Sequence, residues 1–469
     1  MSSSSTPVLA ATALFAGAFG LIWASNGTGI IRADHDRHVD IPGTLTVPLQ
    51  VRAAYNGEKI FFQYRWPAER PRIFHDVLRY QGGEWRRYGD PVPGPNPHGL
   101  HEDRVAMLVD DGSVPEFGRY GGYVAIGAGL AELSTQAGAE EVGAHPRLGK
   151  ELKEEAVTKY LPATRTIPAD WTTTVDGERM ATLRKSGYFL DLWHWRANRG
   201  APIGVADDQA VHEIRGGDAG RSAWSTNWDG ERKQPRWMFD PEKAGHAALR
   251  WEEVEGGAVA QDSVYYLHAG TMIPYDADHP WQEGDTLPRR ALRDPTGSRA
   301  DIGASGRWAD GHWTVTLSRA LDTGNPLDDK IFHDGGSYSV AFAIHRHATG
   351  GRWHYVSLPL SLGLSREAEL QAVRFAGDAP PWQQEWKAVK LFYPGQVTWP
   401  LLTSEEHAGS AQIRRGVPVK RYHTEEQLAS YGVEMEFRER IVGQWRLTLL
   451  AGLLLFAAAG FALVRAPRN

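Results

Sequence analysis

Residues 44–66, TLTVPLQVRAAYNGEKIFFQYRW, decide the fold class of this chain. Apolar and polar residues alternate on both sides of Asn56-Gly57, a dipeptide typical of the two-residue hairpin turn. Val47 and Leu49 fall on one face of the first segment, because successive side chains of a strand point to opposite faces. The stretch therefore predicts a β-hairpin with one buried face.

Similar signals recur towards the C-terminal half of the chain. Residues 297–324 contain two glycine turns, Ser305-Gly306 and Asp310-Gly311, among alternating segments. Residues 333–364 contain a third turn signal, at residues 349–351. Short strands with regularly spaced turns and no crossover helices are typical of an antiparallel β-sandwich. We expect a mainly-β fold with helical insertions.

Composition narrows the classes of function. The chain has 469 residues, a net charge of -6, 18 tryptophans and 51 glycines, so nothing in its charge favours nucleic acid as a partner. It has no cysteine. Disulfides, iron–sulfur clusters, cysteine zinc sites and covalent c-type haem are therefore excluded.

Both ends of the chain are apolar. Residues 7–24 form an uncharged run that predicts a signal sequence or an N-terminal anchor. Residues 447–464, LTLLAGLLLFAAAGFALV, are long enough for a helix that spans a lipid bilayer. Arg465 and Arg468 follow this segment and predict a cytoplasmic C-terminus, which would place the bulk of the chain on the other side of the membrane.

The predicted domain organisation follows from these patterns. A signal sequence or anchor occupies residues 1–30, and the β-sandwich domain occupies residues 44–364. A glycine- and glutamate-rich insertion interrupts the domain at about residues 117–165. A proline-punctuated extension at residues 365–440 is expected to dock on a partner, and the transmembrane helix follows at residues 447–464.

A histidine lies between two tryptophans in the segment 191–199, DLWHWRANR. An imidazole flanked by large flat rings suits a buried ligand for a flat cofactor such as haem, and His194 is therefore a candidate ligand between Trp193 and Trp195. The alternative is a packed histidine in an ordinary strand. Arg196 or Arg199 is a candidate partner for a haem propionate, and a surface charge on the sandwich is the alternative for both arginines.

A methionine occupies the middle of the segment 102–110, EDRVAMLVD. Met107 shares a strand face with Val105 and Val109, so we expect its side chain to point inward. Methionine is a common core residue, and a plain core role for Met107 is the alternative to a ligand role.

Four blocks occur together in one order: EDRVAMLVD, DLWHWRA, GRWADGHWTVTLSRAL and YSVAFAIH followed by RWHYVSLPL. In this combination, the chain resembles the haem-binding subunits related to ethylbenzene dehydrogenase and dimethylsulfide dehydrogenase, over residues 44–364. The resemblance implies a β-sandwich that holds one non-covalent haem b and passes electrons without catalysis of its own.

The resemblance also implies a ligand pair and partners. Met107 would be the early axial ligand and His194 the later one. Lys185 is the alternative for the second ligand, and His354 is the alternative for either. The implied partners are a membrane cytochrome, an iron–sulfur subunit or a molybdenum enzyme, at the periplasmic face of a bacterial cytoplasmic membrane.

Two other classes of function remain open on the sequence alone. The tryptophans could stack on sugar rings in a carbohydrate- or ligand-binding module. A hydrolase would need paired carboxylates, for which Asp110-Asp111 and Asp328-Asp329 are available. Adjacent side chains in a strand point to opposite sides, which disfavours a hydrolase.

Overall fold

The structure is a computed structural model of the whole chain. It describes residues 9–10, 12–18, 46–88, 100–128, 135–346, 354–394, 397–405, 407–436 and 438–465. Most of the predicted signal or anchor segment, residues 1–30, lies outside these described residues, as does the turn predicted at residues 349–351.

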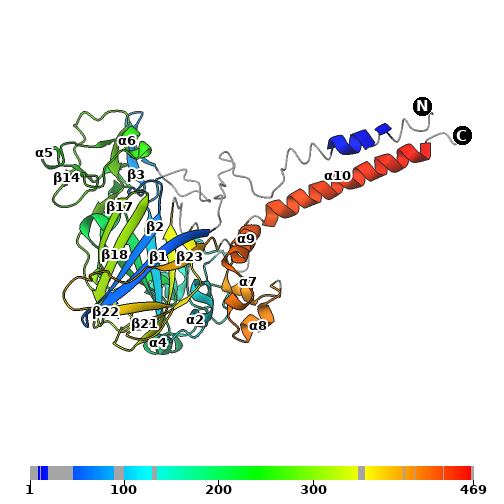
Figure 1. The fold of residues 1–469 in the computed structure, drawn as a ribbon. Coiled ribbons are helices and arrows are strands. Elements are labelled where there is room, and N and C mark those ends of the chain that lie inside the picture. Colours follow the sequence, from blue (N-terminus) through cyan, green and yellow to red (C-terminus); the bar gives the residue numbers. More distant parts are fainter. Residues whose placement is uncertain are drawn as a thin grey trace.

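The described residues form a mainly-β body built on one 13-stranded sheet, which confirms the predicted class (Figure 1). Its strands are β1 (Thr46–Tyr55), β2 (Lys59–Pro67), β5 (Arg104–Asp110), β6 (Leu190–Arg196), β7 (Asp207–Val211), β8 (Arg215–Gly217), β17 (Gly303–Ala309), β18 (His312–Ala320), β19 (Ser337–His345), β20 (Tyr355–Val356), β21 (Leu360–Leu364), β22 (Leu370–Arg374) and β23 (Lys387–Phe392).

The sheet closes on itself, so its strands are not divided into the two separate sheets expected of a sandwich. Strand pairing runs β1-β22-β21-β19 and returns to β1 through β20 and β23, which makes a six-stranded ring. Two arms leave this ring, β2-β18-β17 from β1 and β5-β6-β7-β8 from β19. Strand β22 pairs in parallel with both β1 and β21, so the sheet is not wholly antiparallel.

The hairpin predicted from residues 44–66 is confirmed. Strands β1 and β2 pair antiparallel as far as Tyr55 and Ile60, and Gly57 has a φ of 93° in the turn. Glycine adopts this left-handed region without the steric cost that a Cβ atom would add. The side chain of Asn56 accepts hydrogen bonds from the backbone N–H groups of Glu58 and Lys59.

Of the two turns expected between residues 297 and 324, only one forms. Strands β17 and β18 meet at Asp310-Gly311, where Ala309 pairs with His312. The turn expected at Ser305-Gly306 is wrong, because Gly306 lies inside β17. A Cβ atom on Gly306 would lie 2.4 Å from Trp195, so glycine here allows a close approach between the two arms.

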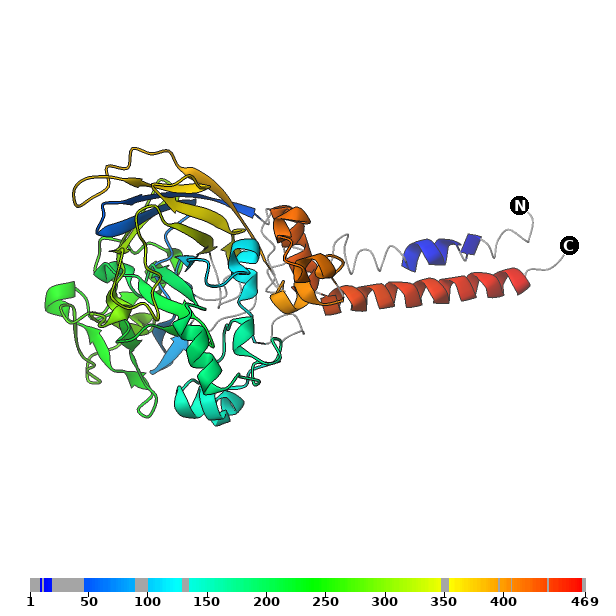
Figure 2. The same ribbon diagram turned by 90° about the horizontal axis from the view of Figure 1, so that it is seen from below.

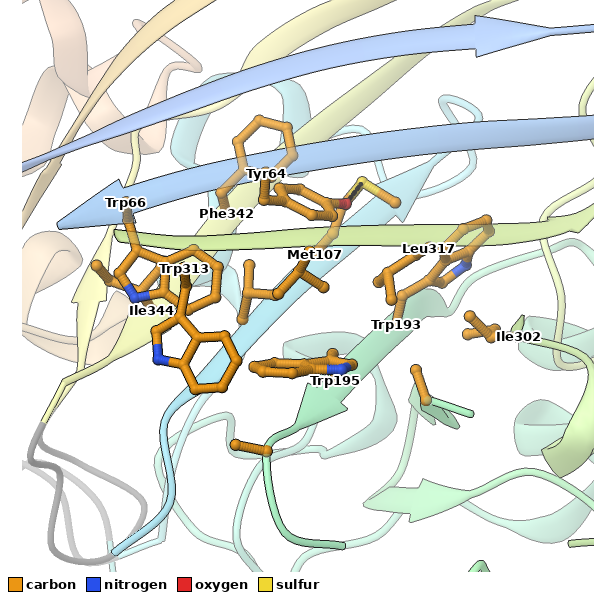
Figure 3. Packing of buried hydrophobic residues seen from close by; sticks show 14 of the residues in the cluster. Tyr64, Trp66, Met107, Trp193, Trp195, Ile302, Trp313, Leu317, Phe342 and Ile344 are labelled. Carbon is orange, nitrogen blue, oxygen red and sulfur yellow. Dashed lines mark hydrogen bonds between the residues drawn. The ribbon is translucent and has the colours of Figure 1, made fainter. Parts of the chain in front are cut away.

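The core lies where the two arms pack face to face. Trp195 from β6 contacts Trp66 and Trp313 from the other arm, with ring centroids 6.1 and 5.1 Å apart (Figure 3). Trp193 meets Phe62 edge-on at 5.5 Å. Buried aromatic rings contribute large apolar areas, so this cluster holds the arms together.

A smaller lobe covers one end of the arms. Its four-stranded sheet has the order β13-β15-β3-β4, and three two-stranded pairs, β9 with β16, β10 with β11 and β12 with β14, flank it. The bounds are β3 (Val77–Gln81), β4 (Glu84–Tyr88), β9 (Trp224–Thr226), β10 (Trp228–Asp229), β11 (Gln234–Pro235), β12 (Trp237–Phe239), β13 (Leu249–Arg250), β14 (Met272–Pro274), β15 (Asp285–Pro288) and β16 (Arg290–Leu292).

Short helices fill the connections, including the predicted insertion at residues 117–165. They are α2 (Phe117–Tyr120), η2 (Gly121–Val124), α3 (Ala139–Ala144), η3 (Pro146–Glu151), η4 (Pro162–Thr164), α4 (Gly177–Lys185), η5 (Ala201–Ile203), α5 (Pro241–Ala244), α6 (Trp251–Gly256), η6 (Ser298–Ala300), α7 (Trp399–Thr403), α8 (Ser410–Arg414), η7 (Val419–Arg421) and α9 (Glu425–Glu436).

The chain after residue 364 has two parts with different roles. Strands β22 and β23 belong to the ring, so the sheet continues beyond the predicted domain boundary. Helices α7, α8 and α9 then lead to α10 (Arg438–Arg465). Within α10, Ile441–Phe461 is long and apolar enough to cross a membrane, and none of it is buried.

Helix α10 projects away from the β body in both views (Figures 1 and 2). The short N-terminal helix, drawn in blue, runs beside it. The rings of Phe15 and Phe456 lie 6.3 Å apart. The two apolar ends of the chain therefore meet each other outside the β body.

Candidate functional site

A cavity of about 360 Å³ opens on the outer face of the arm that carries β5 and β6. Cofactor pockets are commonly concave, largely apolar sites of roughly 300–1,000 Å³. Its floor comes from β5, β6, β7 and β19. Its other walls come from η2, from residues 157–159 of the insertion and from residues just before α7.

Small side chains make the room for this cavity. Ala106 of β5 and both Ala341 and Ala343 of β19 line it, and Gly122 of η2 faces them. These alanines share one face because they are two residues apart or directly paired, as Ala106 is with Ala343. Larger side chains at these positions would fill the space.

His194 lies in the cavity wall and is 2% exposed. Its Nδ1 accepts hydrogen bonds from Arg215 at 2.8 Å and from Arg196 at 3.0 Å. A guanidinium group only donates, so Nδ1 carries the lone pair and the proton of the neutral ring is on Nε2. Burial and the charges of Arg196 and Arg215 hold the pKa of His194 well below its usual value, which keeps the ring neutral.

Nε2 of His194 has no hydrogen-bond partner among the described residues. Burying an N–H donor without a partner is costly. The side chain lines the cavity, so an acceptor atom of a bound ligand would supply the missing partner.

Two further histidines line the same cavity. His345, at the end of β19, is 6% exposed, and its ring lies 6.0 Å from that of His194. His354 stacks on His345 with ring centroids 5.0 Å apart. Burial, the charge of Arg104 and the neighbouring His354 hold the pKa of His345 well below its usual value. Neutral imidazole is the form that binds metals.

His345 differs from His194 in its hydrogen bonds. Its Nδ1 is buried and has no partner within the part of the chain that the structure describes. No arginine among the described residues donates a hydrogen bond to that nitrogen, so its lone pair is not engaged as that of His194 Nδ1 is. His345 is therefore better suited than His194 to donate a lone pair to a metal.

Other polar groups reach the cavity from its outer walls. Tyr123 of η2 is 6% exposed, and its hydroxyl has no hydrogen-bond partner among the described residues. Lys159 also lines the cavity, from the insertion. The insertion thus contributes both a hydroxyl and an amine to a site whose floor is the sheet.

Met107, predicted as an axial ligand, is buried on the opposite face of β5 (Figure 3). Tyr64 donates a hydrogen bond to its sulfur at 3.4 Å, and Phe342 pairs with it on β19. Met107 pairs with Trp193, whereas His194 pairs with Ala106. The sheet therefore lies between Met107 and His194, and the expected pair is not brought together.

Most of the remaining residues predicted for the site do not line the cavity either. Trp193 and Trp195 point into the core with Met107, so they do not line the cavity. Arg196 is 6% exposed and lies beside His194. Lys185, at the end of α4, is exposed and does not line the cavity.

The site residues missed at the sequence level are His345, Arg215, Tyr123 and Lys159. His345 falls within the block YSVAFAIH, where it continues the spacing of Ala341 and Ala343. That run of two small residues and a histidine on one strand face was a usable signal. Arg215 carried no such signal, because it follows an irregular connection.

Three of the four carboxylates considered for hydrolysis are held by cations in the structure. Lys330 lies 2.7 Å from Asp111 and 3.5 Å from Asp110. Asp329 pairs with the buried Arg319 at 2.7 Å. Carboxylates held by cations in this way are structural ion pairs rather than a free acid and base.

The fold and the site define a class: a mainly-β protein with an apolar cavity in one sheet face and imidazoles in its wall. Residues 33–357 match the model of the ethylbenzene dehydrogenase family, and the chain belongs to this family, which confirms the resemblance seen in the sequence. It is also 25% identical over 247 residues to cytochrome c-552 of Stutzerimonas stutzeri, covering 50% of this chain and 74% of that protein.

The family match covers the strands that form the cavity floor. Strands β5, β6, β7 and β19 all fall within residues 33–357. Pro394, Val397 and Thr398, which complete one wall, lie beyond the matched range.

Proposed function

We propose that this chain is a membrane-anchored electron-transfer subunit that holds one b-type haem in the cavity. The observation that carries the proposal is an apolar cavity with buried, neutral imidazoles in its wall, within a member of this family. The similarity to a cytochrome agrees with a haem-related role. The chain has no cysteine, so thioether attachment is excluded and the haem would be non-covalent.

The residues present fit such a group. The alanines of the floor leave flat apolar space, and the imidazoles offer nitrogen donors in their neutral form. When bound, a haem held by two side chains of this chain would supply one-electron transfer. The proposal therefore assigns no catalysis to this subunit.

We assign His345 as one side chain that would hold the haem iron, in place of the pair Met107 and His194. Met107 is on the wrong side of the sheet, and the lone pair of His194 Nδ1 is directed at two arginines. His354 and Lys159 are two other side chains of the cavity wall that could supply the second donor.

A visible spectrum of the purified full chain in detergent tests the proposal. We expect a Soret band and, after reduction with dithionite, the sharp α-band of low-spin haem b. Absence of both bands after reconstitution with haem would refute the proposed function and favour a ligand-binding module without haem.

His345→Ala tests the ligand assignment. We expect it to abolish the low-spin spectrum, because one iron–nitrogen bond is lost. His212→Ala is a matched control, since His212 is also buried but does not line the cavity. A low-spin spectrum that survives in His345→Ala would exclude His345 as a ligand.

The anchor and its orientation are further parts of the proposal. Helix α10 supplies the span, and the arginines that follow it favour a cytoplasmic C-terminus, with the β body on the periplasmic side. Electrons would then pass between partner redox subunits, such as a membrane cytochrome and an iron–sulfur or molybdenum subunit, on that side.

The absence of cysteine makes the orientation easy to test. Arg307→Cys places a single thiol at an exposed position of β17. A membrane-impermeant maleimide added to intact spheroplasts is expected to label it. Labelling only after lysis would place the β body in the cytoplasm.

A further inference from the structure

The arginines grouped around Arg215 and its neighbours outnumber their carboxylate partners. Arg196 and Arg299 share Asp207, with distances of 2.6 and 2.8 Å. Arg199 and Arg104 share Glu102, at 2.6 and 3.5 Å. Arg215 has no carboxylate within 4.0 Å among the described residues.

Five guanidinium groups thus face two carboxylates, which leaves an excess of three positive charges beside an apolar cavity. Arginine cannot lose its charge in a protein, and a buried charge without a counter-ion is unfavourable. The excess indicates that the site is completed by an anionic ligand.

Of these five arginines, Arg215 is the one that lines the cavity wall. Its positive charge is therefore the one that a bound ligand would meet. Its Nε and Nη2 donate to Oε1 of Gln209 at 3.2 and 2.9 Å, and Nη2 also donates to His194. Neither partner is charged. No hydrogen bond from Nη1 is present within the described part of the chain, so this group retains donors for a ligand.

His194 adds a second donor to the wall of the same cavity. The two arginines that donate to its Nδ1 leave the proton on Nε2, which has no partner among the described residues. A guanidinium group and a neutral imidazole N–H both donate hydrogen bonds to carboxylate oxygens, so the cavity wall offers two donors to an anionic ligand.

We propose that Arg215 and His194 form a carboxylate-binding pair at the edge of the cavity, and that this pair recognises the propionates of the bound haem. This inference rests on the proposed function. It assigns His194 to the side chains of the cofactor rather than to its iron.

Haem dimethyl ester separates this inference from the proposed function, because its propionates are esterified and uncharged. The full chain in detergent is depleted of haem and titrated with haem or with the diester, and binding is followed by the Soret band. We expect the wild type to bind haem about 10- to 100-fold more tightly, the range of charge-assisted hydrogen bonds.

Arg215→Gln is expected to bind haem more weakly and the diester as the wild type does. Its preference for haem over the diester should therefore fall to a few-fold. Arg215→Lys should keep part of it, because it retains the charge but not the planar fork. His194→Phe should reduce it by a smaller factor. Arg307→Gln, on the exposed face of β17, is the control and should behave as the wild type.

The outcomes are distinguishable. A wild type that binds neither compound refutes the proposed function and this inference with it. A wild type that binds both equally, or an Arg215→Gln protein that keeps the full preference, overturns this inference alone. Thermal unfolding of each haem-depleted variant identifies a change in folding. If Arg215→Gln is unfolded, Arg215→Lys is compared with the wild type in its place.

Discussion

The two faces of the β5–β6 strand pair have opposite characters. The inner face carries Met107, Trp193 and Trp195, packed against aromatic rings of the other arm. The outer face carries Ala106 and His194 and opens into the cavity. Neighbours in the sequence thus belong to different environments.

The contrast between the two faces shows how one strand pair can contribute to both stability and ligand binding. Large rings on the inner face hold the arms together through buried apolar area. Small residues on the outer face leave space, and His194, His345 and Tyr123 around that space each have a polar atom without a hydrogen-bond partner among the described residues. Changes on the inner face should mainly alter stability, and changes on the outer face should mainly alter haem binding.

The largest effect is expected on the inner face. Trp195→Ala should lower the free energy of unfolding by about 3–5 kcal/mol, because it removes a buried indole and leaves a cavity. Urea unfolding of the full chain in detergent, followed by fluorescence, measures this change. Trp382→Ala, at a half-buried position outside the core, should cost clearly less. Equal losses of unfolding free energy in the two variants would show that the inner face contributes no more to stability than a half-buried position outside the core.

The free energy of unfolding should depend on pH through Asp103, which directly precedes β5 at the end of the same face. Burial raises the pKa of Asp103 to about 7, although Trp313 donates to its Oδ2 at 2.7 Å. Between pH 4 and 7 the folded state therefore binds more protons than the unfolded state, and stability falls as pH rises.

Asp103→Asn removes this proton-linked loss. From pH 5 to pH 7 the free energy of unfolding of the variant should rise relative to the wild type by roughly 2 kcal/mol, since each unit corresponds to about 1.4 kcal/mol. Asp262→Asn, at an exposed position, is the control. A difference that does not depend on pH would show that Asp103 is ionised throughout.

Filling the outer face should weaken binding with little loss of stability. Ala106→Phe places a ring in the cavity, and we expect haem affinity to fall by about 1–3 kcal/mol, or roughly 5- to 150-fold. Soret titration measures the affinity, and unfolding of the haem-free protein measures the stability. Unchanged affinity would place the haem elsewhere.

The smallest effect is expected for Met107→Leu. The two side chains have similar volumes, so the free energy of unfolding should fall by less than about 1.5 kcal/mol, in part through the lost hydrogen bond from Tyr64. The haem spectrum should not change. A spectral change typical of a lost thioether ligand would place the haem on the inner face. It would contradict the assignment of haem binding to the outer face.

Local patterns predicted the elements of this fold well. The hairpin about Asn56-Gly57 formed as expected, because turn geometry and strand alternation are local properties. The turn expected at Ser305-Gly306 failed for a tertiary reason. Gly306 is needed for close contact with Trp195 across the core, which no local pattern shows.

The sequence by itself determined the mainly-β class, the absence of cysteine chemistry, the apolar C-terminal segment and the family. It also placed Met107 and His194 in strands, but the choice of face depends on what each strand packs against. Only the tertiary structure decided that the ring closes through β23, that Met107 and His194 lie on opposite sides of the sheet, and that His345 and Arg215 join His194. Strand pairing between distant segments makes these decisions, because it brings together residues that are more than eighty positions apart in the chain.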